Sequence, residues 1–306
     1  MSAARASAAA AAVVGVIGAG AMGMGVVASL LRGGIATAVC DVSDTARRDA
    51  RDRGAALASS AAALAQCCGI TIVLVVDTDQ VDDALFGPDG FATTPSVDRV
   101  LVLSSTLPPD YVAALAPRLA RAGSTLVDAP VSGGPARAHA GTMTIIAAGP
   151  AAALERCEPV FARIAGKVFR VGSAAGDGAK FKIVNNLLAA VNLAAAAEAL
   201  ALARRAGLDP AQVAEVVGAS SGASWIFGDR VPRALAGDFA PRAAAKILAK
   251  DAAIAAAFAA RLGADATFAR AAKAAFEAAV RAGYGDADDA SIIEWAPSRS
   301  AAIATT

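Results

Sequence analysis

A glycine-rich turn between an apolar run and a helix-forming stretch constrains this chain of 306 residues more than any other feature. The sequence GAGAMG occupies residues 18–23, directly after the β-branched run 13–17 and at the start of the apolar stretch 21–31. Gly18 permits a tight turn, Gly20 lets the backbone approach a pyrophosphate, and Gly23 allows close packing of helix on strand. The turn therefore predicts a dinucleotide site, with cofactor contacts from Gly18, Ala19, Gly20, Ala21, Met22 and Gly23.

The acidic residue Asp41 indicates which dinucleotide is bound. It follows the next β-branched run, residues 37–40, and lies 23 residues after Gly18. A carboxylate at this place can accept hydrogen bonds from both ribose hydroxyls of NAD, whereas an NADP site usually has an arginine nearby. The nearest arginines, Arg47 and Arg48, lie further along the following helix. The sequence predicts NAD as cofactor, and the alternative role for Asp41 is an ordinary helix cap.

The first half of the chain alternates short β-branched runs with stretches rich in Ala and Leu. Near-continuous apolar runs, without polar alternation, are typical of strands buried on both faces of a parallel sheet. We therefore predict a Rossmann domain with a doubly wound parallel sheet over residues 13–175, preceded by a disordered Ala-rich extension at residues 1–12. The expected strands are residues 13–17, 37–40, 70–76, 99–105, 124–130, 142–149 and 167–172, with a helix at 151–164 before the last strand.

After Gly178 the pattern changes from alternating elements to helices alone. No convincing strand follows, and four stretches rich in Ala and Leu have Gly or Pro near their ends. These stretches are residues 182–205, 210–217, 243–261 and 266–282. The predicted fold class is α/β, with the N-terminal Rossmann domain followed by an all-α C-terminal domain, residues 176–306, for substrate binding and oligomerisation.

Composition excludes several classes of partner and chemistry. The 28 Lys and Arg residues balance 27 Asp and Glu residues without a basic patch, so we expect no nucleic acid partner. The glycines within the apolar run 6–31 would make a poor membrane helix, so we expect no membrane association. The four cysteines show neither metal-ligand spacing nor a disulfide framework, which favours a reducing cytoplasm. His139 is the only histidine, which disfavours a catalytic zinc site and any other metal, so another residue must move protons.

Three further motifs carry candidate chemistry and, together with the glycine turn, resemble a known family. They are DAPVSGG at residues 128–134, GDGAKFKIVNN at 176–186 and the pair Lys250-Asp251. Their order and spacing resemble the β-hydroxyacid dehydrogenase family, which includes 3-hydroxyisobutyrate dehydrogenase and tartronate semialdehyde reductase. The likeness covers nearly the whole chain, and the joint match is far more specific than any single motif.

The resemblance implies a role for two side chains in the third motif. Lys182 matches the catalytic lysine of the family, which transfers a proton at the carbinol oxygen. Asn186 matches the asparagine that orients the substrate, and it follows four residues later on the same expected helix face. Lys180 is the competing candidate, but it points to another helix face, and we expect it to be a solvated charge.

The same resemblance implies the remaining binding residues. Ser132, Gly133 and Gly134 match the residues that hold the substrate carboxylate. A hydroxyl and successive backbone N–H groups can form a compact anion-binding nest, although Gly-Gly-Pro is also compatible with a plain β-turn. Expected cofactor contacts outside the glycine turn are Val76, Thr106 and Lys250.

Two stretches, residues 221–242 and 283–289, look most like the branch of the family that acts on L-threonate. This implies NAD-linked oxidation at C2 to the 2-oxo acid, in carbohydrate acid catabolism. Ser224, Trp225 and Arg230 can supply polar contacts to such a substrate, and core packing is the alternative for Trp225.

Other functions remain open at this point. Tartronate semialdehyde reductase and 3-hydroxyisobutyrate dehydrogenase are the enzymatic alternatives, and a non-catalytic NAD-binding sensor is an alternative of another class. An imine-reducing relative is a third option, but such relatives generally lack the lysine. The resemblance further implies a homodimer or homotetramer in the cytoplasm.

Overall fold

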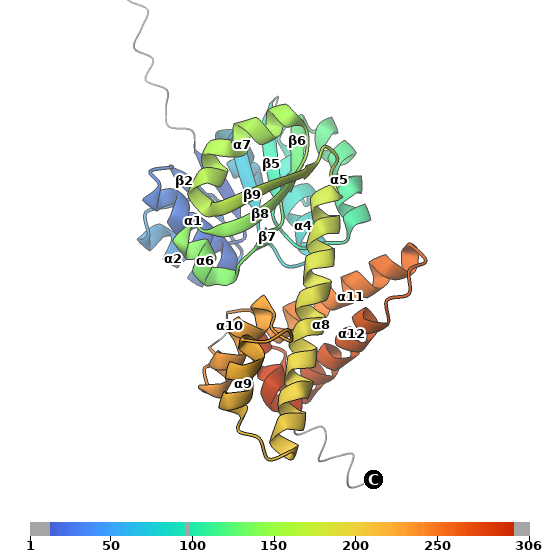
Figure 1. Cartoon of the computed structure of the whole chain (residues 1–306). Helices are drawn as coiled ribbons and strands as arrows, with labels where there is room; N and C mark the ends of the chain where they lie inside the picture. Colours follow the sequence, from blue (N-terminus) through green and yellow to red (C-terminus); the bar gives the residue numbers. More distant parts are fainter. Residues whose placement is uncertain (1–12, 96–97, 241, 297–306) are drawn as a thin grey trace, which may run out of the picture. The chain divides into compact units, whose positions relative to one another are not determined.

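A computed structural model describes residues 13–95, 98–240 and 242–296 of the chain. The chain forms two compact units, Met1–Lys182 and Ile183–Thr306, and the division falls inside a single helix, α8 (Asp177–Arg205). Each unit is described separately below (Figure 1). The extension expected at residues 1–12 lies outside the described residues.

A nine-stranded sheet forms the centre of the first unit, in the order β3-β2-β1-β4-β5-β6-β8-β7 with β9 beside β8. Strands β1 to β6 pair in parallel, as the apolar runs predict. At one edge β8 runs antiparallel to both β6 and β7, because only the short helix α6 (Gly134–Ala140) separates β7 from β8. The strands are β1 (Val14–Ile17), β2 (Thr37–Cys40), β3 (Ala56–Leu57), β4 (Ile70–Val73), β5 (Arg99–Leu103), β6 (Ser124–Asp128), β7 (Val131–Ser132), β8 (Met143–Ala148) and β9 (Ala165–Gly172).

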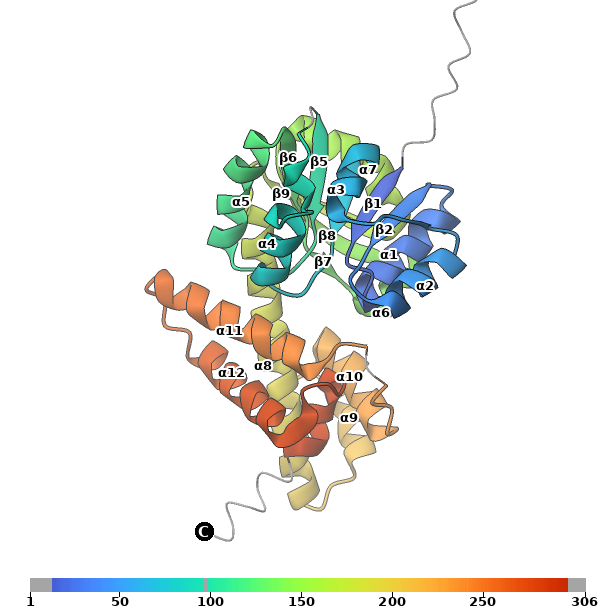
Figure 2. The same ribbon diagram turned by 180° about the vertical axis from the view of Figure 1, so that it is seen from behind.

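Helices cover both faces of this sheet (Figures 1 and 2). Neighbouring residues along a strand point into different cores, so that Val102 belongs to one core and Leu103 to the other. Burial on both faces explains why the strands are continuous apolar runs. The first face packs against α1 (Ala21–Arg32), α2 (Asp44–Asp52), α6 and α7 (Ala151–Ile164); the second packs against α3 (Ala61–Cys67), α4 (Thr78–Phe86) and α5 (Pro109–Arg121), with a 3-10 turn, η1 (Phe91–Thr93), after α4.

The strand register brings the ends of the parallel strands to one level. Ile17 of β1 pairs with Cys40 and with Val73, Val73 pairs with Leu103, and Leu103 pairs with Asp128. The segments that follow these strands therefore leave from the same edge of the sheet. The strand order reverses between β1 and β4, which is where α/β sheets bind ligands.

The second unit is helical, apart from an isolated bridge between Ala244 and Asp288, over the residues that the structure describes. Its core contains Leu193, Phe227 and Phe276. The helix α10 is missing from the sequence expectation because Gly228 and Pro232 interrupt the helical pattern. The elements are the C-terminal part of α8, α9 (Pro210–Gly218), α10 (Trp225–Leu235), α11 (Ala245–Arg261), α12 (Thr267–Ala279), a π-turn η2 (Val280–Tyr284) and a 3-10 turn η3 (Asp289–Ser291).

Helix α8 is long and apolar enough to cross a membrane, and no other helix among the described residues passes that test. Its most apolar window is 44% buried within the molecule. Core helices of soluble proteins pass the same test of length and composition, and α8 contributes Leu193 and Leu200 to the core of the second unit.

Candidate active site

The glycine turn after β1 has the shape that a dinucleotide needs. Gly18 has φ +87°, and a Cβ added there would lie 2.7 Å from the carbonyl oxygen of Leu74. A Cβ at Gly23 would overlap the carbonyl oxygen of Gly18. At Gly20 a Cβ would meet nothing within 4 Å, and no side chain caps the helix α1 that starts there. Open space beside an uncapped helix start suits a pyrophosphate, so these residues fit a dinucleotide cofactor.

Substitutions at two of these glycines should separate folding from cofactor binding. Gly23→Ala should lower the free energy of unfolding by about 1–3 kcal/mol, because the added methyl overpacks the turn. Gly20→Ser should keep that free energy, because serine is a good N-cap, yet weaken dinucleotide affinity about tenfold by filling the open space. Denaturant unfolding and NADH fluorescence titration measure the two effects. A Gly23→Ala protein as stable as the wild type would contradict the steric argument.

Asp41 ties the end of β2 to the glycine turn. Its carboxylate accepts the N–H of Ala19 at 2.6 Å and the N–H of Ser43 at 2.7 Å. Ser43, and not Asp41, is the N-cap of α2, because its hydroxyl accepts the N–H of Ala46. The carboxylate therefore lies beside the expected cofactor turn, on the strand next to β1.

Two further expected cofactor residues follow strands that end at the same edge. Val76 comes after β4, is exposed, and donates its N–H to Oε1 of Gln80 at 2.9 Å. Thr106 comes after β5 and is half-buried. The parallel register of β4 and β5 with β1 places both segments at the edge where the glycine turn begins.

The second motif forms a left-handed turn at the end of β7. Ser132 is the last residue of β7, and Gly133 and Gly134 follow with φ of +127° and +72°. Gly133 is the N-cap of α6. Helix α6 lies against α1 so closely that a Cβ at Gly25 would be 2.6 Å from Cβ of Ala138. The turn that is expected to hold a carboxylate is therefore fixed to the helix that begins at the cofactor turn.

The two lysines of the third motif differ in their surroundings. Lys182, on α8, is 7% exposed. The side chain of Lys180 is 53% exposed, and its Nζ pairs with Asp177 at 2.9 Å. Only Lys182 is therefore held at a buried position.

Asp251 organises the other expected polar residues, and the sequence interpretation assigned it no role. Its Oδ2 accepts a hydrogen bond from Nδ2 of Asn186 at 2.6 Å, and its Oδ1 pairs with Nζ of Lys250 at 2.8 Å. Nδ2 of Asn185 donates to Oδ1 of Asn186 at 2.9 Å. The amide of Asn186 is thus held from both ends. The position of Asp251 directly after Lys250 was the one sequence feature that pointed to a role for it. Its partner Asn186 could not be identified in this way, because it lies 65 residues away in the sequence.

Asp128, the first residue of the second motif, is a further residue that sequence reasoning left without a role. It ends β6, is buried, and accepts the N–H groups of Gly176 and Ala179 at 2.9 Å each. Burial raises the pKa of its carboxyl to about 6, against the lowering effect of these backbone N–H groups. An acidic residue at the end of a buried strand was the only signal in the sequence.

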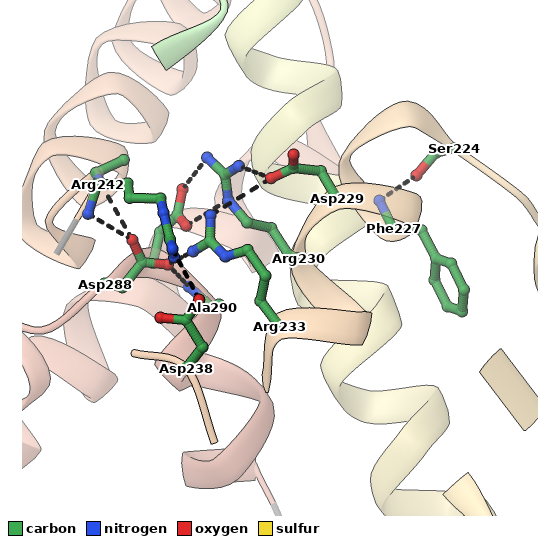
Figure 3. Close-up of polar contacts among 11 residues, drawn as sticks. Ser224, Phe227, Asp229, Arg230, Arg233, Asp238, Arg242, Asp288 and Ala290 are labelled. Carbon is green, nitrogen blue, oxygen red and sulfur yellow. Dashed lines mark hydrogen bonds and ion pairs between the residues drawn. The ribbon is translucent and has the colours of Figure 1, made fainter. Parts of the chain in front are cut away.

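An ion-pair network joins the two stretches that carried the substrate resemblance (Figure 3). Nε of Arg230 donates to Asp289 at 2.6 Å, and the same guanidinium pairs with Asp229. Arg233 pairs with Asp288. The side chain of Arg230 is only 12% exposed, so the guanidinium expected to contact substrate is already engaged by two carboxylates.

The start of α10 presents an exposed aromatic ring. The hydroxyl of Ser224 accepts the N–H of Phe227 at 3.1 Å and caps the helix (Figure 3). Phe227 lies in the core, whereas Trp225 is 63% exposed. Core packing therefore accounts for Phe227 but not for Trp225.

Cysteine and metal chemistry have little support among the described residues. All four cysteines are free thiols, and Sγ of Cys67 lies 3.6 Å from Sγ of Cys68. Burial raises the pKa of Cys68 and of Cys157 to about 12, so both stay protonated. No group of three or more His, Cys, Asp or Glu residues within the described ranges is placed to hold a metal ion.

Two family models match the chain. Residues 13–172 match the NAD binding domain of 6-phosphogluconate dehydrogenase. Residues 176–296 match the model described as NAD-binding of NADP-dependent 3-hydroxyisobutyrate dehydrogenase. Together the two models cover both units and identify an NAD(P)-binding protein.

Known relatives extend the similarity along almost the whole chain. An L-threonate dehydrogenase from Cupriavidus necator is 43% identical over 284 residues, which are 93% of this chain and 96% of that protein. A 2-hydroxy-3-oxopropionate reductase from Escherichia coli is 32% identical over 221 residues, 71% of this chain and 75% of that protein. The crystal structure of a 3-hydroxyisobutyrate dehydrogenase from Salmonella typhimurium is 37% identical, covers 92% of this chain and 99% of that chain, and has a TM-score of 0.85.

Proposed function

We propose, from the premise that the chain belongs to the β-hydroxyacid dehydrogenase family, that it oxidises L-threonate to 2-oxo-tetronate with NAD. Family membership makes it a hydroxyacid dehydrogenase with an NAD(P)-binding domain. The observation that carries the chemistry is the buried Lys182, one helical turn before an Asn186 whose amide Asp251 holds in place. The similarity to L-threonate dehydrogenase over 93% of the chain supports the substrate.

Asp41 supports NAD over NADP. Its carboxylate lies beside the glycine turn, and a negative charge at this place disfavours a 2′-phosphate. The nearest arginines have other partners, because Arg47 pairs with Asp44 at 3.9 Å and Arg48 donates to Thr45 at 3.2 Å. The uncapped start of α1 and the space beside Gly20 would hold the pyrophosphate. When bound, the nicotinamide supplies the hydride acceptor.

The chain's own residues would then divide the remaining work. Lys182, as a neutral amine, takes the proton from the hydroxyl at C2, and as an ammonium it returns that proton in the reverse direction. Asn186 orients the hydroxyl with the second hydrogen of its amide, because the first is donated to Asp251 and Oδ1 already accepts from Asn185. The hydroxyl of Ser132 and the turn that follows it hold the carboxylate.

Two other substrates keep specific support. The E. coli relative acts, by its name, as a 2-hydroxy-3-oxopropionate reductase, and the Salmonella structure is a 3-hydroxyisobutyrate dehydrogenase. A methyl-bearing substrate such as 3-hydroxyisobutyrate would favour an apolar wall, whereas Ser224 and Trp225 can donate to the hydroxyls of a sugar acid. A non-catalytic sensor is disfavoured, because it would need neither Lys182 nor Asn186.

A substrate comparison tests this proposal. We expect kcat/KM for L-threonate with NAD to exceed that for 3-hydroxyisobutyrate and for glycerate by about tenfold or more, as polar groups matched to substrate hydroxyls discriminate strongly. Steady-state assays at saturating NAD and at saturating NADP measure the preference for acid and for cofactor separately. A tenfold advantage for another acid would overturn the substrate. Faster turnover with NADP would overturn the cofactor and leave the family reaction intact.

We further propose a homodimer or homotetramer in the cytoplasm. In the second unit, α8 carries exposed Val184, Leu188 and Leu202, and Ala195 lies between them. Their spacing of four, seven and seven residues puts them on one helix face, which suits helix packing against a second copy. The free thiols support a reducing compartment.

A further inference from the structure

The start of helix α8 is fixed to the sheet by one buried carboxylate. Oδ2 of Asp128 accepts two N–H groups at the start of α8, that of Gly176 just before the helix and that of Ala179 in its first turn. The strand neighbours at this level are apolar, with Leu103 on β5 and Ala148 on β8. The carboxylate of Asp128 therefore connects the sheet to the helix through hydrogen bonds, and its neighbours on the adjacent strands are apolar.

Two glycines let the start of α8 pack closely against its neighbours in the first unit. Gly176 has φ +97°, and a Cβ there would lie 2.8 Å from the carbonyl oxygen of Pro109 on α5. A Cβ at Gly178 would lie 2.8 Å from the carbonyl oxygen of Ile146 on β8. The first turn of α8 is thus in direct contact with three elements of the first unit. Lys182 follows Gly178 by four residues, about one helical turn, so the position of this turn sets the position of the amine.

Asp128 is also connected, through strand β8, to the turn at Ser132, Gly133 and Gly134 that is expected to bind the substrate carboxylate. Asp128 pairs with Ala148 of β8, and Ser132 pairs with Thr144 of the same strand. Strand β8 therefore holds Asp128 and Ser132 in a fixed relation. Asp128 thus links the start of the helix that carries Lys182 to the strand that pairs with Ser132, within one compact unit.

The charge on Asp128 does not stabilise the fold. Burial raises the pKa of Asp128 to about 6, above its ordinary value of 3.8; the N–H groups of Ala179, Gly176 and Gly178 lower it, and the charge of Asp177 on α8 raises it. Asp177 itself pairs with Lys180. Because the folded pKa is above the ordinary one, this group makes the protein less stable as pH rises from about 4 to about 6. A buried charge that lowers stability calls for another explanation.

We propose that Asp128 is a positioning residue for the reaction: its ionised carboxylate holds the first turn of α8, and with it Lys182, in place relative to the turn at Ser132. The inference rests on the proposed role of Lys182 in proton transfer. Protonation removes the charge that the two N–H groups bind, because a charged acceptor makes the stronger hydrogen bond. Turnover in the reducing direction, in which Lys182 acts as an ammonium, should therefore fall as pH drops below about 6, whereas dinucleotide binding at α1 should not change.

The variant Asp128→Asn in the full-length enzyme tests this role. The amide has nearly the shape of the carboxyl and lacks its charge, so we expect kcat to fall about 10- to 100-fold through displacement of Lys182. The KM for the dinucleotide should stay the same, and the Tm should equal or exceed that of the wild type. In the reducing direction, in which Lys182 acts as an ammonium, the fall of kcat below about pH 6 should disappear. A purely structural role would instead lower the Tm and leave the pH profile unchanged. Asp177→Asn, on the same helical turn, is the matched control and should keep the wild-type kcat at neutral pH, while the fall of kcat moves to lower pH because the charge that raises the pKa of Asp128 is removed.

A second measurement is independent of substrate. Competitive labelling of amines with acetic anhydride, read by mass spectrometry, compares Lys182 with Lys180 in the same molecule. In Asp128→Asn the labelling of Lys182 should change several-fold, and that of Lys180 should not. Unchanged labelling together with an unchanged pH profile of kcat would overturn the inference. A wild-type enzyme that oxidises no hydroxy acid would overturn the proposed function, while the labelling would still decide whether Asp128 positions Lys182.

Discussion

Replacing Lys182 with alanine should lower kcat by about 10²- to 10⁴-fold, the usual contribution of a positioned proton-transfer group. This range corresponds to about 3–5 kcal/mol of transition-state free energy. The side chain is buried on the first helical turn after the Asp128 link, where bulk water cannot easily replace the amine. Dinucleotide affinity should remain, because the expected cofactor residues lie at the edge of the sheet and not on this turn.

Two further variants make the result specific. Lys182→Arg keeps the positive charge but cannot give up a proton near neutral pH, so it should be nearly as inactive as Lys182→Ala. Lys180→Ala removes the exposed lysine that pairs with Asp177 and should retain wild-type kcat. Steady-state kinetics with NADH titration measure both effects. Wild-type turnover in Lys182→Ala, or loss of activity confined to Lys180→Ala, would refute the assignment of roles.

Replacing Asp288 with alanine should lower the free energy of unfolding of the second unit by about 3–5 kcal/mol. Asp288 is fully buried and pairs with Arg233 (Figure 3). It also accepts the N–H groups of Arg242 at 2.8 Å, and of Ala243 and Ala290 at 3.2 Å. Alanine would remove one of the two carboxylates that pair with Arg233 and leave these N–H groups without their acceptor, which is the costly way to break a buried ion pair.

The pH dependence of this effect has a definite sign. Burial opposes ionisation of Asp288, but the N–H groups of Arg242, Ala290 and Ala243 and the charge of Arg233 outweigh it, so its pKa is lowered. A group with a lowered pKa stabilises the fold above its unfolded pKa, about 3.9, and loses this contribution as pH falls through the folded value. The difference between wild type and Asp288→Ala should therefore shrink below about pH 4.

A neighbouring carboxylate provides the control. Asp286 pairs with Lys246 at 2.5 Å, but its side chain is 90% exposed. Asp286→Ala should therefore change the free energy of unfolding by less than about 1 kcal/mol. Urea denaturation at pH 7, followed by circular dichroism, compares the two variants. Equal stability of both variants would show that the network in Figure 3 contributes little to the fold.

Much of the fold was visible in local patterns. The expected strand 37–40 matches β2, the helix 151–164 matches α7, and the stretch 210–217 matches α9 to within one residue. Each is defined by the spacing of its apolar residues and by the residues at its ends. The very short strands β3 and β7 were not predicted, because two residues are too few to form a pattern.

The expected site residues were located less completely than the fold. The motifs named Lys182, Asn186 and Ser132, but they did not indicate that Asp128 and Asp251 hold the groups around them. Trp225 and Arg230 were both expected to contact the substrate from the stretch 221–242. In the structure Trp225 is exposed, whereas Arg230 pairs with two carboxylates. Whether a side chain has a hydrogen-bond donor left for a substrate depends on partners that come from other parts of the chain.

The residue order alone predicted a Rossmann sheet followed by helices and a glycine-rich turn at residues 18–23, because glycine conformation and apolar spacing are local properties, whereas the candidate lysine was named through the resemblance to a family. Tertiary structure decided the reversed direction of β8, the partners of Asp128 and Asp251, and the joining of residues 230 and 233 to residues 288 and 289. The hydrogen-bond partners are 48 to 65 residues apart in the sequence. These bonds run from Gly176 to Asp128, from Arg230 to Asp289 and from Asn186 to Asp251. A hydrogen bond depends on the positions of atoms in space, and only the packing of the whole unit determines which distant residues meet.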